Sequence, residues 1–313
     1  MTDEIINEKK PEVNKEKRKI NWEAFHDKHY IKLMFIPIVI LILALIYLAV
    51  FYFANGDIMH KDITLTGGTI LTVNVNEKID TNKMTSFLES KLAGKDVSIR
   101  TMKDIYSGNQ IAISIESNAD SDLIKKAVEE YGIKLEEGKY SIEVTGSTLS
   151  KSFGKELLIA VAIAFIFMAI VIFILFRVPI PSLAVIFAAF TDIIVTLAVI
   201  DLLGVKLGTA GIAAFLMLIG YSVDTDIMLT SRALKGKDSG LKLNTRLFSA
   251  IKTGFMMTWT SIAVTLMGYF VLVSPVLKQV FLILSIGLFV DLIATWLGNL
   301  SIIKWYCKKK KIN

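Results

Sequence analysis

The sequence predicts a polytopic α-helical membrane protein with six transmembrane helices and one α+β domain, of the ferredoxin-like split βαβ kind, between the first and the second helix. The chain has 313 residues, of which 53% are hydrophobic, and a mean hydropathy of +0.56. Its apolar residues gather in six long runs, whereas a soluble domain disperses them. Residues 55–152 form a polar block between the first run and the second.

Each apolar run is long enough to cross a bilayer, because about 20 helical residues match a hydrocarbon core of roughly 30 Å. The first run is expected to be a retained anchor, because the charged segment before it is too long for a signal peptide. The chain therefore divides into an N-terminal arm (1–32), a first span (33–54), the polar domain (55–152), further spans (153–303) and a basic tail (304–313). The expected spans are Leu33–Ala54, Leu157–Phe176, Ser182–Leu203, Thr209–Ser231, Ile251–Val273 and Val280–Ile303.

The basic residues predict the orientation of the spans. Lysines and arginines are concentrated in the arm, in the 232–250 loop and in the tail, whereas the opposite short connections hold Lys206 and Lys278. The positive-inside rule then places both termini in the cytoplasm and the polar domain outside the cell membrane. The net charge of +6 follows from these flanks. Contact with anionic lipids explains it better than nucleic-acid binding does.

Short strands and helices are expected to alternate in the extracytoplasmic domain, in the order β-β-α-β-β-α-β. Gly67-Gly68, between the first two strands, is expected to be a turn, a bulge, a point of close approach or a hinge. The single Cys307 excludes an intrachain disulfide. The domain has no His/Cys cluster, no Ser-His-Asp candidate and no phosphate loop. We therefore expect a contact module without catalytic residues, metal or cofactor. The expected strands are Ile63–Thr66, Ile70–Val75, Val97–Thr101, Gln110–Ile115 and Tyr140–Val144, and the expected helices are Asp80–Leu92 and Asp120–Tyr131.

Several spans carry polar side chains, and a charge there costs about 2.5–3.5 kcal/mol on insertion scales. Such groups must face one another or water. A carboxyl group deep in a bundle can accept a proton instead of staying charged, which suits a proton relay. Packing or ion pairing is the alternative for each of them. The candidates are Asp192 in the third span, Asp224 and Asp226 in the fourth, Asp291 with Thr295 and Asn299 in the sixth, and Thr258, Ser261 and Thr265 in the fifth.

Asp224 is the first candidate for the proton-handling residue. It lies two residues from Asp226, so the two side chains point about 200° apart on a helix. Asp226 is nearer the expected cytoplasmic end, where we expect partial solvation. Arg232 follows two helical turns later and is expected either to reach the cytoplasmic interface or to pair with Asp226.

The fourth span, from Ile219 to Arg232, reads IGYSVDTDIMLTSR and resembles the corresponding segment of the SecF family in its archaeal form. Thr66-Gly67-Gly68-Thr69 resembles the Gly-Gly-Thr motif of that family, and the topology also fits. The chain departs from bacterial members at Thr225, where they carry an acid, and at Ser231 and Thr64. The motif residues carried over are Gly67, Gly68, Thr69, Gly220, Tyr221 and Ser222, with Asp192 and Asp291 in the neighbouring spans.

The resemblance implies half of a transporter of the resistance-nodulation-division (RND) superfamily that serves protein translocation. The implied role is an auxiliary subunit of the Sec translocase, driven by an ion gradient, expected to be the proton motive force. The implied partners are SecD, the SecY translocon complex, the translocating preprotein and membrane lipids, with no nucleic acid and no cofactor. An RND-type carrier of lipids or small molecules and a scaffold that uses no gradient are the alternatives. An aspartyl protease built on Asp192 and Asp224 is not favoured, because buried aspartates in a bundle more often relay ions.

Overall fold

The computed structural model describes residues 22–75, 77–104, 107–235, 240 and 242–311. The part of the basic arm before residue 22 lies outside these residues. Within them, six helices are long and apolar enough to cross a membrane, and a four-stranded sheet lies between the first and the second of these. The predicted fold class is confirmed.

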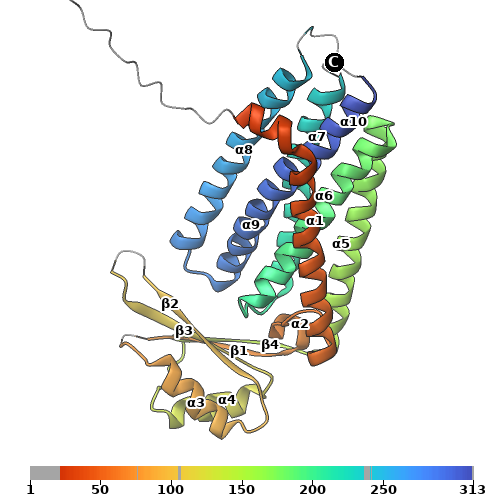
Figure 1. The fold of residues 1–313 in the computed structure, drawn as a ribbon. Helices are drawn as coiled ribbons and strands as arrows, with labels where there is room; N and C mark the ends of the chain where they lie inside the picture. The colour runs from red at the N-terminus through yellow and green to blue at the C-terminus, as the bar shows by residue number, and fades with distance from the viewer. Residues whose placement is uncertain (1–21, 76, 105–106, 236–239, 241, 312–313) are drawn as a thin grey trace, which may run out of the picture.

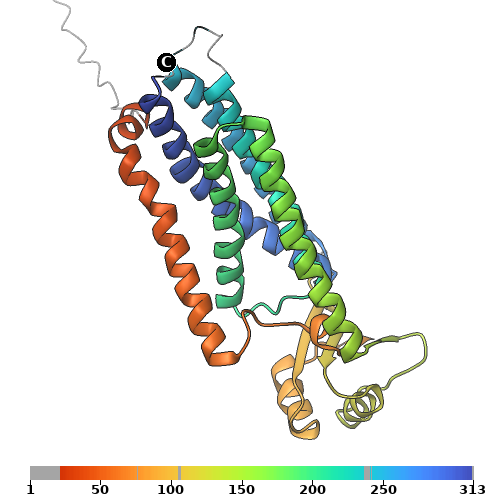
Figure 2. The same ribbon diagram turned by 90° about the vertical axis from the view of Figure 1, so that its right-hand side faces the viewer.

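The six long helices form a bundle with three interior members (Figure 1). In the most apolar windows of α6, α7 and the last span, 56% of the residues are buried, compared with 6% for α5. Figure 2 shows α1 and α5 on opposite sides of α6. The three spans that carry aspartates are therefore the interior ones. The helices are α1 (Trp22–Asn55), α5 (Ser147–Phe176), α6 (Pro179–Leu202), α7 (Thr209–Lys235), α8 (Leu243–Val271) and α9 (Pro275–Ile293).

The last span is not a regular α-helix throughout. After α9, residues Ala294–Asn299 form a turn of π-helix, and the chain continues as α10 (Leu300–Lys309). Pro37 of α1 packs against this turn, where a Cβ added to Gly298 would lie 3.1 Å from the proline ring. Short π segments inside α-helices occur frequently at functional sites.

The polar domain is an antiparallel sheet in the order β2-β3-β1-β4, with two helices on one face. This topology is the predicted split βαβ fold. The core lies between the sheet and its helices, and the other face of the sheet points toward the bundle (Figure 1). The elements are β1 (Gly68–Asn74), α3 (Thr81–Lys91), β2 (Val97–Lys103), β3 (Gln110–Ser117), α4 (Ser121–Glu130) and β4 (Tyr140–Thr145).

One predicted strand is wrong. Residues Ile63–Thr66 form a single helical turn, α2, so the domain begins α-β and not β-β. The carboxylate of Asp62 accepts from the backbone N–H of Thr64, and the N–H of Gly67 donates to the carbonyl of Ile63 at 2.7 Å. The cap and the left-handed Gly67 (φ 87°) together outweigh the β-branched composition of the segment.

The glycine pair is a point of close backbone approach. A Cβ on Gly67 would lie 2.3 Å from the Cα of Ser147, and one on Gly68 would lie 2.6 Å from the carbonyl oxygen of Ser117. Only glycine leaves room for this packing. Gly67 thus sets α2 against the first turn of α5, while β4 ends at Thr145, with only Gly146 between it and the start of α5 at Ser147.

A second connection joins the polar domain to the bundle. The segment after α1 pairs with the connection between α6 and α7: Asp62 N–H donates to the carbonyl of Leu207 at 2.9 Å, and Leu207 N–H donates to that of His60 at 2.7 Å. Asp201, at the end of α6, accepts from the backbone N–H of His60 and lies 2.8 Å from its ring Nδ1. The domain is therefore attached through both of its ends.

Candidate functional site

Three interior helices bring one aspartate each into the middle of the bundle. Asp192 of α6, Asp226 of α7 and Asp291 of α9 are between 0% and 1% exposed. In the part of the chain that the structure describes, none of the three forms an ion pair with a basic side chain. Three uncompensated negative charges in such a place are very costly. The cluster is therefore expected to hold protons.

The hydroxyl of Thr295 lies between two of these carboxyl groups. Its Oγ1 is 2.9 Å from Asp291 Oδ1 and 3.0 Å from Asp226 Oδ1. A threonine hydroxyl has one proton to donate. Both contacts are hydrogen bonds only when one of the two carboxyl groups is protonated and donates to Thr295. The geometry thus corresponds to a state with at least one proton on this pair.

Two further side chains orient the cluster. Asn299 donates from Nδ2 to Asp226 Oδ1 at 2.6 Å, and Ser222 donates to Asp192 Oδ2 at 2.5 Å. The second oxygen of each of the three carboxyl groups has no hydrogen-bond partner among the described residues. These oxygens are available to accept or exchange a proton. The same residues contain no group of three His, Cys, Asp or Glu side chains that could hold a metal ion.

The π turn aligns the donors of the last span. On a regular α-helix, positions four residues apart are rotated by about 40°, so Asp291, Thr295 and Asn299 would drift around the axis. The wider turn at Ala294–Asn299 counteracts this drift. Thr295 and Asn299 consequently both reach the same oxygen of Asp226. The sequence predicted a polar stripe here but not the π turn.

The expected positions of the two aspartates in α7 are corrected. Asp226, expected to be partly solvated, is completely buried in the cluster. Asp224 is exposed on the opposite face of α7 and lines a small cavity of about 50 Å³ with Met257 and Ser261 of α8. Depth along the helix axis does not decide burial here, because the face of α7 that carries Asp226 points into the bundle. Because the two side chains point about 200° apart, only one can face the interior of the helix bundle, and in this chain it is Asp226 and not Asp224.

Arg232 does not contact Asp226. Its Nη1 donates to the carbonyl and hydroxyl of Ser249 at 2.8 and 3.1 Å, and to Thr253 Oγ1 at 3.0 Å. It therefore ties the end of α7 to α8. Of the two expected positions for this side chain, pairing with Asp226 is not observed.

The motif residues separate into two places. Ser222 is buried and belongs to the carboxyl cluster, whereas Tyr221 is 46% exposed and Gly220 has open space around it. Thr69 is in the α+β domain, where its hydroxyl donates to the carbonyl of Ala119 at 3.0 Å. The fifth span contributes packing contacts: Ser285 of α9 donates to Thr265 Oγ1 at 2.9 Å.

Comparison with known proteins decides the family. Residues 124–309 match the family model described as "Protein export membrane protein SecD/SecF, C-terminal". The chain belongs to the SecD/SecF family. The predicted resemblance is confirmed.

Three relatives of this SecD/SecF chain carry the same name. It is 38% identical over 279 residues to the protein-export membrane protein SecF of Methanocaldococcus jannaschii, covering 87% of this chain and 93% of that one. It is 36% identical to the SecF of Methanothermobacter thermautotrophicus, covering 89% and 93%. It is 30% identical to the SecF of Pyrococcus furiosus, covering 90% and 92%.

A solved structure shares the fold of this SecD/SecF chain. SecDF of Thermus thermophilus, described as a translocon-associated membrane protein, superposes with a TM-score of 0.70 at 17% identity. The alignment covers 92% of this chain and 38% of the SecDF chain. At this identity the likeness concerns the fold alone. The chain thus corresponds in length to one part of that protein.

Proposed function

We propose that this chain is an auxiliary subunit of the Sec protein translocase that acts with SecD to promote preprotein export, using an ion gradient and specifically protons. The names of its relatives support the export role. The observation that carries the coupling role is the position of Thr295 between Asp226 and Asp291. A buried carboxyl pair that shares one hydroxyl changes its hydrogen bonding whenever a proton enters or leaves.

The proposed cycle couples this proton to helix packing. With a proton on the pair, α7 and α9 pack as described, since Thr295 is hydrogen-bonded to one oxygen of each carboxyl group. Loss of that proton leaves two like charges next to one hydroxyl and favours separation of the helices. Asp192 of α6 takes part through Ser222, which is on α7. Changes in the bundle reach the α+β domain through the contact of Asp62 with Leu207 and through α5.

The proposed orientation follows the basic residues. Both termini are cytoplasmic, the α+β domain is extracytoplasmic, and the protein is a multi-pass protein of the cell membrane. The basic tail that ends α10 supports this, because it includes Lys308 and Lys309. In this orientation the domain contacts emerging preprotein near the SecY channel.

A membrane partner would cover the exposed polar face of α7 and α8. Asp224 and Tyr221 are exposed on α7, and Ser261 lies beside them on α8. A carboxyl group facing lipid is unfavourable, so such a residue normally faces protein or water. SecD is the proposed partner.

The test is export of a secreted preprotein in cells carrying Asp226→Asn, Asp291→Asn or Asp192→Asn, with membrane levels of this protein and of SecD measured in parallel. We expect normal levels and lost export for Asp226→Asn and Asp291→Asn. Asp122→Asn, which makes the same substitution at an exposed residue of α4, is the control and should leave export unchanged. Full export by all three buried variants would refute coupling through the cluster. Export that also survives collapse of the proton gradient would favour a scaffold.

A further inference from the structure

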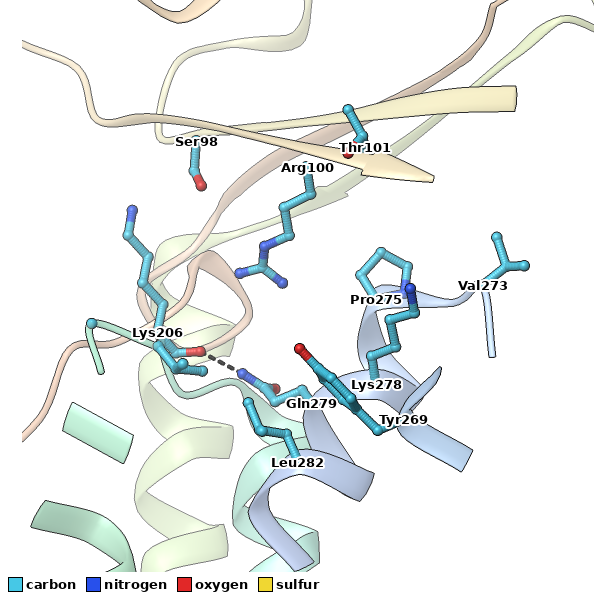
Figure 3. A pocket seen from close by; sticks show the side chains of 12 residues that line it. Ser98, Arg100, Thr101, Lys206, Tyr269, Val273, Pro275, Lys278, Gln279 and Leu282 are labelled. Atoms are coloured by element: carbon cyan, nitrogen blue, oxygen red, sulfur yellow. Dashed lines mark hydrogen bonds between the residues drawn. The ribbon is translucent and has the colours of Figure 1, made fainter. Parts of the chain in front are cut away.

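A positively charged pocket lies between the sheet and the bundle. Its volume is about 320 Å³, and it is lined by residues of β2, the α6–α7 connection and the facing ends of α8 and α9 (Figure 3). Arg100, Lys206 and Lys278 line it from three different elements. None of its twelve lining residues is acidic. An anion is the ligand that such a lining recognises.

The three cations retain binding capacity. Arg100 uses Nη2 for both of its ion pairs, with Asp62 at 3.1 Å and Glu116 at 3.3 Å. Its Nε and Nη1 make no hydrogen bond within the described chain. No carboxylate among the described residues lies within 4.0 Å of Lys206 or Lys278. An arginine fork beside two lysines is well suited to phosphate, because it supplies directed donors and further charge.

Neighbouring side chains fix the floor of the pocket. Gln279, which is 8% exposed, donates from its amide to the backbone carbonyl of Lys206 and so joins α9 to the α6–α7 connection. Figure 3 shows this bond below the guanidinium of Arg100, with the hydroxyl of Tyr269 turned toward the same space. The donors are therefore mounted on connected elements and not on separate mobile loops.

The pocket sits where the apolar helices end. Its wall includes the segment between the end of α8 at Val271 and the start of α9 at Pro275. Phe270 is 71% exposed, and Val276 on the adjacent helix end is 54% exposed. Tyrosine is typical of membrane interfaces, as Tyr269 would be here. An occupant with an anionic head and an apolar tail matches both halves of this environment.

We propose that this pocket binds the phosphate headgroup of a membrane lipid, with the acyl chains lying along Phe270 and Val276. Arg100, Lys206 and Lys278 hold the phosphate. Because Arg100 belongs to the sheet and Lys278 to the bundle, the bound headgroup joins the two parts of the molecule. The lipid is then a component of the contact between domain and membrane helices.

The test uses the full-length protein in neutral detergent and native mass spectrometry with phosphatidylglycerol. The variant is Lys206→Gln with Lys278→Gln, because neither lysine forms an ion pair with a described residue whose loss would disturb the fold. We expect the apparent Kd for phosphatidylglycerol to rise roughly fivefold or more, since two charged phosphate contacts are lost. The matched control is Lys103→Gln with Lys95→Gln, two changes in the α+β domain outside the pocket, which should leave the Kd unchanged.

Competition identifies the source of the anion. Inorganic phosphate should displace the lipid from the wild type only at far higher concentration, because it lacks the acyl chains. Equal affinity for inorganic phosphate would overturn a lipid site in favour of a free-anion site. A glutamate-rich peptide that binds the wild type, but not the lysine variant, while phosphatidylglycerol binds both equally, would overturn it in favour of acidic preprotein segments. Unchanged lipid binding in the lysine variant would also overturn the proposal.

Discussion

The amide nitrogen of Asn299 lies 2.6 Å from Oδ1 of Asp226 and joins the π turn of the last span to α7. Both residues are at most 1% exposed. A buried carboxyl group that loses such a donor has no water to replace it. The orientation of Asp226 therefore depends on a local helix geometry in another part of the chain.

Asn299→Ala should destabilise the protein, because it leaves Asp226 buried with one donor fewer. An unsatisfied buried polar group costs about 1–3 kcal/mol. The measurement is the thermal unfolding midpoint of purified protein, which should fall by several degrees. Asn74→Ala, at the exposed end of β1, is the control. A midpoint equal to that of the wild type would mean that the Asn299 contact is dispensable.

Thr295→Val should impair export without preventing insertion. Valine keeps the shape of threonine but removes the hydroxyl that serves Asp226 and Asp291. A hydrogen bond to a charged group contributes about 1.5–3 kcal/mol, so the export rate should fall roughly tenfold to a hundredfold. Thr295→Ser retains the hydroxyl and should restore most of the rate. If the Thr295→Val and Thr295→Ser variants have the same export rate, the hydroxyl has no part in coupling.

Glu116 should make the stability of the α+β domain depend on pH. Burial raises the pKa of Glu116 to about 7, although Arg100 lowers it, Asp62 raises it further and Lys206 lowers it. The folded state therefore holds a proton between pH 4.5 and 7 that the unfolded state has released, so stability falls as the pH rises through this window. A shift of this size corresponds to at most about 3 kcal/mol.

The check is the unfolding midpoint of the full-length protein from pH 4.5 to 8, measured with a probe in the α+β domain. Glu116→Gln should flatten the decline between pH 5 and 7, since glutamine stays neutral. Glu143→Gln, a change on strand β4, which β1 separates from the strand of Glu116, should leave it unchanged. An identical pH profile for wild type and Glu116→Gln would show that another group titrates.

Gly67→Ala should destabilise the junction between α2 and α5. The added methyl group would lie 2.3 Å from the Cα of Ser147, and the left-handed φ of 87° adds backbone strain. Strain of this kind costs about 1–3 kcal/mol before the steric clash is counted. Gly146→Ala, at an open position with ordinary backbone angles, is the matched control. Limited proteolysis near residue 67 should increase in the first variant and not in the second.

Hydropathy and alternation were sufficient to predict the bundle and the split βαβ sheet. Residues 63–66 were predicted wrongly because their composition favours a strand, whereas the cap at Asp62 and the turn at Gly67 favour a helix. The burial of Asp226 required knowledge of which face of α7 meets α9. The π turn lies where Pro37 of α1 packs at Gly298, and a single sequence does not reveal such a contact.

Gly146 is the single residue between β4 and α5. Gly67, at the start of the domain, packs against Ser147 in the first turn of the same helix. α5 is also the span with the smallest buried share, at 6%. The sheet is thus fixed to the helix that the rest of the bundle holds least. A small tilt of α5 would displace the far side of the domain by a larger distance. Small rearrangements among the spans would therefore become larger displacements of the domain at the membrane surface.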